Sequence, residues 1–162
     1  MGICTKLVDV ARPLDVEWVA DNLQCRDRQE IEGLGFSDMR LTLQLSVAKS
    51  DDPICFWNPD GMICGVAGVS RTDAHSGAIW MVTTPYVRQY PKLFFKEAKK
   101  WVDSQTSYEL LHNIADPRNV MHMKLLHMLG FKKLSYVTTP TNLTYVEFAK
   151  LTKSCAFQLP QS

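Results

Sequence analysis

Apolar positions along the chain change their spacing several times, and each spacing predicts a different element. Continuous or alternating apolar runs are typical of strands, whereas apolar residues three and four positions apart are typical of amphipathic helices. The runs predict strands at residues 6–10, 54–57, 62–70, 78–84, 108–115, 134–138 and 143–149. The helical spacing predicts helices at residues 14–23, 26–34, 91–104 and 120–129, and another that begins after residue 38.

Cap and turn residues support these boundaries. Asp38 is a good N-cap for the third helix, in which we expect Leu41, Leu45 and Ala48 to share the buried face. Pro91 suits the first position of a helix, and Gly130 suits the position after the end of one. No linker divides the chain, so we expect one domain at residues 1–151 and a tail at residues 152–162.

The order of these elements predicts the fold class. One strand is followed by three helices, three strands, a helix, a strand, a helix and a final hairpin, which indicates a single α/β domain with a mixed, mostly antiparallel central sheet flanked by helices. The strand at 78–84 is apolar on both faces, so we expect it near the centre of the sheet. The helix at 91–104 would make a parallel crossover to the strand at 108–115, and ligands of such sheets lie at the carboxyl ends of the strands.

Composition narrows the classes of partner. The 162 residues include 18 Lys and Arg against 17 Asp and Glu, a net charge of +1 that gives no electrostatic drive toward nucleic acid or an anionic membrane. No run approaches the roughly 20 apolar residues of a membrane span. The five cysteines include no C-x-x-C pair, and His122 and His127 have poor spacing for a metal. We therefore expect reduced thiols and no metal.

The segment from Tyr108 to Leu134 carries the clearest motif. An Asn that follows a strand, here Asn119, precedes an apolar helix and then Leu129-Gly130-Phe131. This pattern resembles the last motif of the GNAT acyltransferases, and the element order over about residues 6–150 is similar to theirs. A narrower resemblance, to a GNAT-like family of tailed phages that includes an internal virion protein of short-tailed coliphages, lies in residues 79–84, 90–95, 101–102 and 115–119, with residues 12–16 and 27–31 fitting as well.

The GNAT resemblance implies that acetyl-CoA binds where two parallel strands separate. It places pantetheine on the backbone of Val82, Thr83 and Thr84, and the pyrophosphate at the turn before the helix at 91–104. There Arg88 and Lys92 would add positive charge, and Asn119 would position the cofactor. The acceptor would be an amine, which attacks the thioester directly.

Two positions depart from the enzymes of that family. Their phosphate loop reads Arg/Gln-x-x-Gly-x-Gly/Ala, whereas residues 88–93 here retain Arg88 but have neither glycine, and Pro91 has no N–H to donate. Many of these enzymes also place a Tyr four residues before the Gly of Leu-Gly-Phe, as a general acid. This chain has Leu126 there, which cannot transfer a proton.

Two hypotheses therefore stay open. In the first, the chain is an N-acyltransferase; its catalytic residues are not identified, and Glu17, Glu30, Glu32 and Asp73 are candidates for the base. In the second, the same fold has lost catalysis and serves as a phage virion, assembly or host-interaction protein. The phage resemblance implies a location in the cytoplasm of an infected bacterium or in the virion, with a virion or host protein as partner and no secretion.

Overall fold

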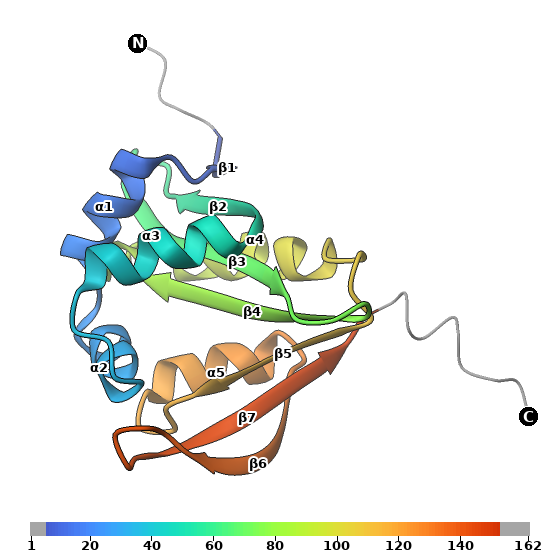
Figure 1. Cartoon of the computed structure of the whole chain (residues 1–162). Helices are drawn as coiled ribbons and strands as arrows, with labels where there is room; N and C mark the ends of the chain where they lie inside the picture. The colour runs from blue at the N-terminus through green and yellow to red at the C-terminus, as the bar shows by residue number, and fades with distance from the viewer. Residues whose placement is uncertain (1–5, 153–162) are drawn as a thin grey trace, which may run out of the picture.

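The computed structural model describes residues 6–152, which form one mixed seven-stranded sheet in the order β1-β2-β3-β4-β5-β7-β6 (Figure 1). The strands are β1 (Val8–Val10), β2 (Asp51–Trp57), β3 (Ile63–Arg71), β4 (Ser76–Thr83), β5 (Leu110–Ala115), β6 (Lys132–Thr138) and β7 (Thr144–Leu151). The helices are α1 (Pro13–Asp21), α2 (Cys25–Gly33), α3 (Met39–Lys49), α4 (Pro91–Asp103) and α5 (Val120–Met128), with a short 3-10 helix at Pro85–Arg88.

The described residues confirm the predicted fold class. Every predicted strand and helix is present, and β4 lies in the middle of the sheet. All strand pairs are antiparallel except β4 with β5, which are parallel and joined through α4 as the crossover predicts. Within residues 6–152 no helix is long and apolar enough to cross a bilayer. The boundary at residue 151 stays a prediction, because residues 153–162 of the expected tail lie outside the described residues.

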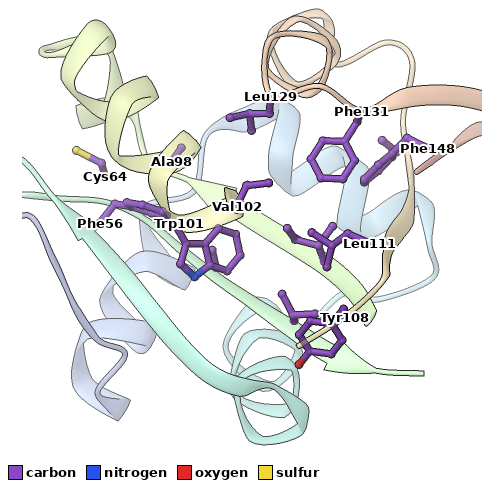
Figure 2. Close-up of a cluster of buried hydrophobic side chains, with 14 of the residues drawn as sticks. Phe56, Cys64, Ala98, Trp101, Val102, Tyr108, Leu111, Leu129, Phe131 and Phe148 are labelled. Carbon is purple, nitrogen blue, oxygen red and sulfur yellow. The ribbon is translucent and has the colours of Figure 1, made fainter. Parts of the chain in front are cut away.

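Two hydrophobic cores cover the two faces of the sheet. Residues of α1 and α3 pack on one face, and residues of α4 and α5 pack on the other. The second core is rich in aromatic rings: Phe56 meets Trp101 edge to face at 6.1 Å, and Phe131 meets Phe148 at 5.3 Å (Figure 2). Such edge-to-face pairs add to the free energy gained by burial alone.

The predicted buried face of α3 is wrong. Met39 and Leu43 are buried, whereas Leu41 is 55% and Leu45 49% exposed. The helix is apolar on more than one side, so spacing alone allowed either face. The choice follows from packing against α1 and β3, which the local sequence does not specify.

Candidate functional site

The sheet divides between its two parallel strands. β4 and β5 pair at only three positions, from Ser76 opposite Leu110 to Ala78 opposite His112. Beyond them Asn113 donates its amide Nδ2 to the carbonyl oxygen of Ile79 at 2.8 Å, and then the strands diverge (Figure 1). Toward their carboxyl ends, where the sequence predicted a ligand, the two strands are not paired with each other, and we call this unpaired stretch the gap.

The backbone that faces this gap belongs to alternate residues of β4. Thr84 donates its N–H to the carbonyl of Cys64 at 2.9 Å and its hydroxyl to the carbonyl of Ile63 at 2.6 Å, so it is bound to β3. In an antiparallel ladder, every second residue directs its N–H and C=O groups to the same neighbouring strand. Val82 lies two residues before Thr84, opposite Val66, so its backbone groups also point to β3. The peptide groups of Met81 and Thr83 are therefore the ones directed to the gap. Sequence reasoning named Thr83 but missed Met81.

A carboxylate from α2 connects residues on the two sides of the gap. Asp27 accepts hydrogen bonds at one oxygen from both the N–H and the hydroxyl of Thr83, each at 2.7 Å. Its other oxygen accepts from the side-chain amide of Asn119 at 2.8 Å. One half-buried side chain thus joins the end of β4 to the start of α5.

Glu30, one turn further along α2, makes a second connection. Its carboxylate accepts from the N–H of Asp116 at 2.6 Å and lies 2.9 Å from Nδ1 of His122. Its backbone carbonyl accepts from the hydroxyl of Tyr145 at 2.7 Å. Residues three apart share one side of a helix, so α2 presents Asp27 and Glu30 together to the separated strands.

The pairing with Glu30 changes the protonation of His122. Burial lowers the pKa of His122, but the charge of the nearby Glu30 carboxylate and its hydrogen bond outweigh burial, and the pKa is raised above its usual 6.5. The side chains are only 18% and 12% exposed, so solvent screens the pair little. The pairing with Glu30 therefore favours the protonated form of His122, which links α5 to α2.

The predicted phosphate position lies at the start of α4. Tyr90 is the N-cap residue and makes no side-chain cap hydrogen bond. Its hydroxyl instead donates to Asp60, in the turn between β2 and β3, at 3.1 Å. The N–H groups of Lys92 and Leu93 have no partner in the helix, as in the first turn of any helix. Lys92 is exposed and forms no ion pair within residues 6–152, so this end of α4 is suited to an anion.

Arg88 and Asn119 have local partners as well. The guanidinium of Arg88 donates to Oε1 of Gln24 at 2.9 Å, and Gln24 in turn donates its side-chain amide to Thr83 Oγ1 and its N–H to the carbonyl of Thr83. Asn119 caps α5 by accepting from the N–H of His122 at 3.3 Å while it donates to Asp27. The structure therefore brings Thr83, Arg88 and Asn119 into one network.

The candidate bases are spread over the molecule. Glu17 pairs with Arg40 at 2.7 Å on the outer side of α1, and Glu32 is exposed on α2. Asp73 precedes β4 and lies at the opposite end of that strand from the gap, where hydrogen bonds from the N–H groups of His75 and Ser76 lower its pKa despite some desolvation. Glu30 alone of the four candidates belongs to the network at the gap. Asp27, which does as well, lies in the stretch 27–31 that fits the phage-family resemblance, but nothing in the sequence marked it as a site residue.

Among the described residues, the candidate thiol, the position of the usual general acid and the metal-ligating side chains offer no further chemistry. Burial raises the pKa of the Cys64 thiol to about 11, so it is not a thiolate at neutral pH. Leu126 packs against the core on the α4 and α5 face. Within the described part of the chain, no group of three or more His, Cys, Asp or Glu side chains could hold a metal ion.

Comparison with solved structures identifies the architecture. An acetyltransferase of the GNAT family from Streptococcus pneumoniae aligns over 90% of this chain and 98% of its own, with a TM-score of 0.57 and 16% identity. The chain has the GNAT fold. No protein-family profile and no curated protein sequence matches it.

Two GNAT-fold structures with bound ligands are also similar. The enzyme AAC(6')-Ib, in complex with ribostamycin and coenzyme A, aligns over 96% of this chain and 97% of its own, with a TM-score of 0.68 and 16% identity. Spermidine N-acetyltransferase from Vibrio cholerae, in complex with CoA and spermine, aligns over 92% of this chain and 96% of its own, with a TM-score of 0.67 and 7% identity. At such identities the likeness is one of GNAT fold, and activity must be argued from this chain's own residues.

Proposed function

We propose that the protein is an acyl-CoA-dependent N-acyltransferase that transfers an acetyl group from acetyl-CoA to an amine. The observation that carries the proposal is the early separation of β4 from β5, after three residue pairs, beside the uncapped N-terminus of α4. A peptide-like chain can add to the edge of β4 at Met81, between the occupied backbone groups of Ile79 and Thr83. The fold neighbours that contain coenzyme A give independent support.

The residues present fit such a cofactor along most of its length. Met81 offers backbone groups to pantetheine, next to Val82 and before Thr84, which follows the end of β4. Thr83 would add its own groups only by releasing Asp27 and Gln24. The free N–H groups of Lys92 and Leu93 and the Lys92 ammonium suit the pyrophosphate, although Pro91 has no N–H to contribute. Arg88 would join them by releasing Gln24, and Asn119 borders the gap on the α5 side.

Asp27 is the candidate to hold the acceptor. Acetyl-CoA would supply an activated thioester when bound. Asp27 places a carboxylate at the gap, fixed by Thr83 and Asn119, where it can bind an ammonium group and receive its proton before attack. Glu30 and His122 hold α2 in place behind it.

A second candidate function is a non-catalytic one, as a phage virion, assembly or host-interaction protein. The observation that favours it is that the Thr83 N–H is already bound to Asp27, so α2 closes the place where a thioester carbonyl would lie. The missing loop glycines point the same way. In this hypothesis the network at the gap holds the fold together and the partner is a protein.

Thermal unfolding with and without acetyl-CoA separates the two functions. Ligand at about 100 times its Kd stabilises the folded state by about 2.7 kcal/mol, which raises the Tm by several degrees for a domain of this size. We expect such a dose-dependent rise. Lys92→Glu and Arg88→Ala should reduce it, whereas Lys96→Glu, an exposed lysine further along α4, should not. A Tm that is unchanged at millimolar acetyl-CoA would contradict the acyltransferase proposal and favour the second candidate.

A further inference from the structure

An apolar pocket lies between α5 and the hairpin of β6 and β7, on residues that the acyltransferase proposal does not use. Its volume is about 410 Å³, within the range of small-molecule sites, about 300 to 1,000 Å³. The apolar side chains that line it are Met123, Leu126, Phe131, Val146 and Phe148. It is therefore large enough for a ligand and apolar enough to bind a hydrocarbon chain.

The pocket exists because α5 and β6 do not close over the sheet. No residue of α5 is fully buried, although the helix faces the aromatic core. The pairing of β6 with β7 is irregular between Lys133 and Tyr136, and nearly all of β6 is exposed. Phe131 and Phe148, whose rings are 5.3 Å apart, lie side by side at this place (Figure 2). Both line the pocket although they are only 6% and 4% exposed, so each offers a small part of its ring to it.

The polar residues of the pocket are all basic. His127, Lys132 and Lys133 complete its lining, and no Asp or Glu belongs to it. All three are exposed, and none of their side chains forms an ion pair or a hydrogen bond with other residues between 6 and 152. Two unpaired ammonium groups beside an apolar pocket complement a ligand with an anionic head and an apolar body.

We propose that this pocket binds a single-chain alkyl carboxylate, a free fatty acid of medium length. The chain lies over Phe131 and Phe148, where flexible Met123 adapts to its shape. The carboxylate lies at the rim beside Lys132 and Lys133. A concave pocket of this volume encloses one chain, whereas a bilayer surface would need a protruding apolar face. The site is separate from the gap between β4 and β5.

Calorimetric titration of the full chain with dodecanoate, below its micellar concentration, tests the proposal. We expect saturable binding, and decanoate and octanoate should bind about fourfold more weakly per methylene removed, the factor that corresponds to burying one CH2 group. Dodecyltrimethylammonium, with the same chain and the opposite charge, is the matched control and should bind at least tenfold more weakly than dodecanoate.

Variants place the binding in the pocket. Leu126→Trp fills it and should abolish binding, whereas Leu134→Trp, on the exposed surface of β6, should not. Lys132→Glu with Lys133→Glu should weaken dodecanoate at least tenfold. Lys96→Glu with Lys124→Glu makes the same change of net charge at exposed positions outside the pocket and should leave affinity unchanged. Because the lysine variants change only exposed residues, they test the proposal even where Leu126→Trp fails to fold.

Four results would overturn the proposal. They are no binding of dodecanoate at 1 mM, equal binding of the cationic detergent, equal weakening by the two lysine pairs, and binding to anionic phospholipid vesicles but not to free dodecanoate. The last result would assign the surface to a membrane instead. Acetyl-CoA should not compete with dodecanoate, and the binding of acetyl-CoA should not depend on Lys132. A failure of the fatty-acid proposal therefore leaves the proposed acyltransferase activity untouched.

Discussion

Among single residues, Asp27 has the most consequential position. It accepts three hydrogen bonds, from two groups of Thr83 and one of Asn119, and these residues lie on opposite sides of the gap. The same carboxylate could hold an acceptor amine or could keep the gap closed. The two roles predict different effects of removing the Asp27 carboxylate on the binding of acetyl-CoA.

Replacing Asp27 separates these roles. Asp27→Ala leaves the buried Thr83 N–H without its partner, so the free energy of unfolding should fall by about 1 to 3 kcal/mol. If Asp27 holds the acceptor, the Kd of acetyl-CoA should stay within twofold and kcat should fall at least a hundredfold in an amine-acetylation assay. Asp27→Asn, which keeps the shape, should lower kcat in the same way.

The opposite outcome has a distinct signature. If acetyl-CoA binds only after Asp27→Ala, or binds at least tenfold more tightly, then the carboxylate blocks the gap in the native chain. The acyltransferase proposal would then lose its candidate for acceptor binding. Asp73→Ala, at the far end of β4, is the control and should change neither constant.

Sequence reasoning reached part of this network. Thr83, Arg88 and Asn119 were named because a motif placed them, and the structure brings them together. Met81 and Asp27 were missed for physical reasons. The direction of the Met81 peptide group depends on strand register. The contacts of the Asp27 carboxylate depend on how α2 docks, because its partners Thr83 and Asn119 are 56 and 92 positions away in the chain.

Among the elements, α2 has the largest influence for its length. It is a polar helix of nine residues, and its contacts through Asp27 and Glu30 reach β4, α5 and β7. Its spacing predicted a helix correctly. The sequence did not show that the polar side would face the protein, because polar helices usually face solvent.

The ion pair between Glu30 and His122 predicts a pH dependence for the attachment of α2. The folded-state pKa of His122 is raised, so the pair stabilises the folded state fully below pH 6.5, and this stabilisation is lost as the pH rises through the folded-state pKa. His122→Gln should lower the free energy of unfolding by about 1.5 to 3 kcal/mol at pH 6. The difference between the two proteins should shrink at alkaline pH.

Chemical denaturation of both proteins from pH 6 to pH 9 measures this difference. His127→Gln is the matched control, because His127 is exposed on the same helix and has no ion-pair partner within residues 6–152. Its effect should be small at every pH. A difference for His122→Gln that grows with pH would contradict a raised pKa of His122.

For the whole molecule, the element order was sufficient to predict an α/β domain with a mixed sheet, and the GNAT fold was implied by the resemblance at Asn119 and Leu129-Gly130-Phe131. Strand and helix periods, Pro91 and Gly130 gave the sequence of elements, and the parallel crossover followed from it. The extent of pairing between β4 and β5 did not follow, because both strands are long enough to pair over six residues. The face of α3 did not follow either. Both depend on how layers pack against each other.

Because β4 pairs with β5 over only three positions, we expect that the chain can be cut into two fragments between these strands. One half of the sheet consists of β1 to β4 and the other of β5 to β7. Among the described residues the polypeptide crosses between these halves once, through the loop between α4 and β5. Residues 104, 106 and 107 of this loop are exposed. Each half is thus a continuous stretch of chain with its own antiparallel strands. Cleavage between Thr106 and Ser107 should give two fragments that stay together and can be reassembled after separate synthesis, because exposed loops tolerate new termini. Co-purification of residues 1–106 with an untagged 107–162 fragment would measure this, and fragments that do not associate would show that the halves need a continuous chain.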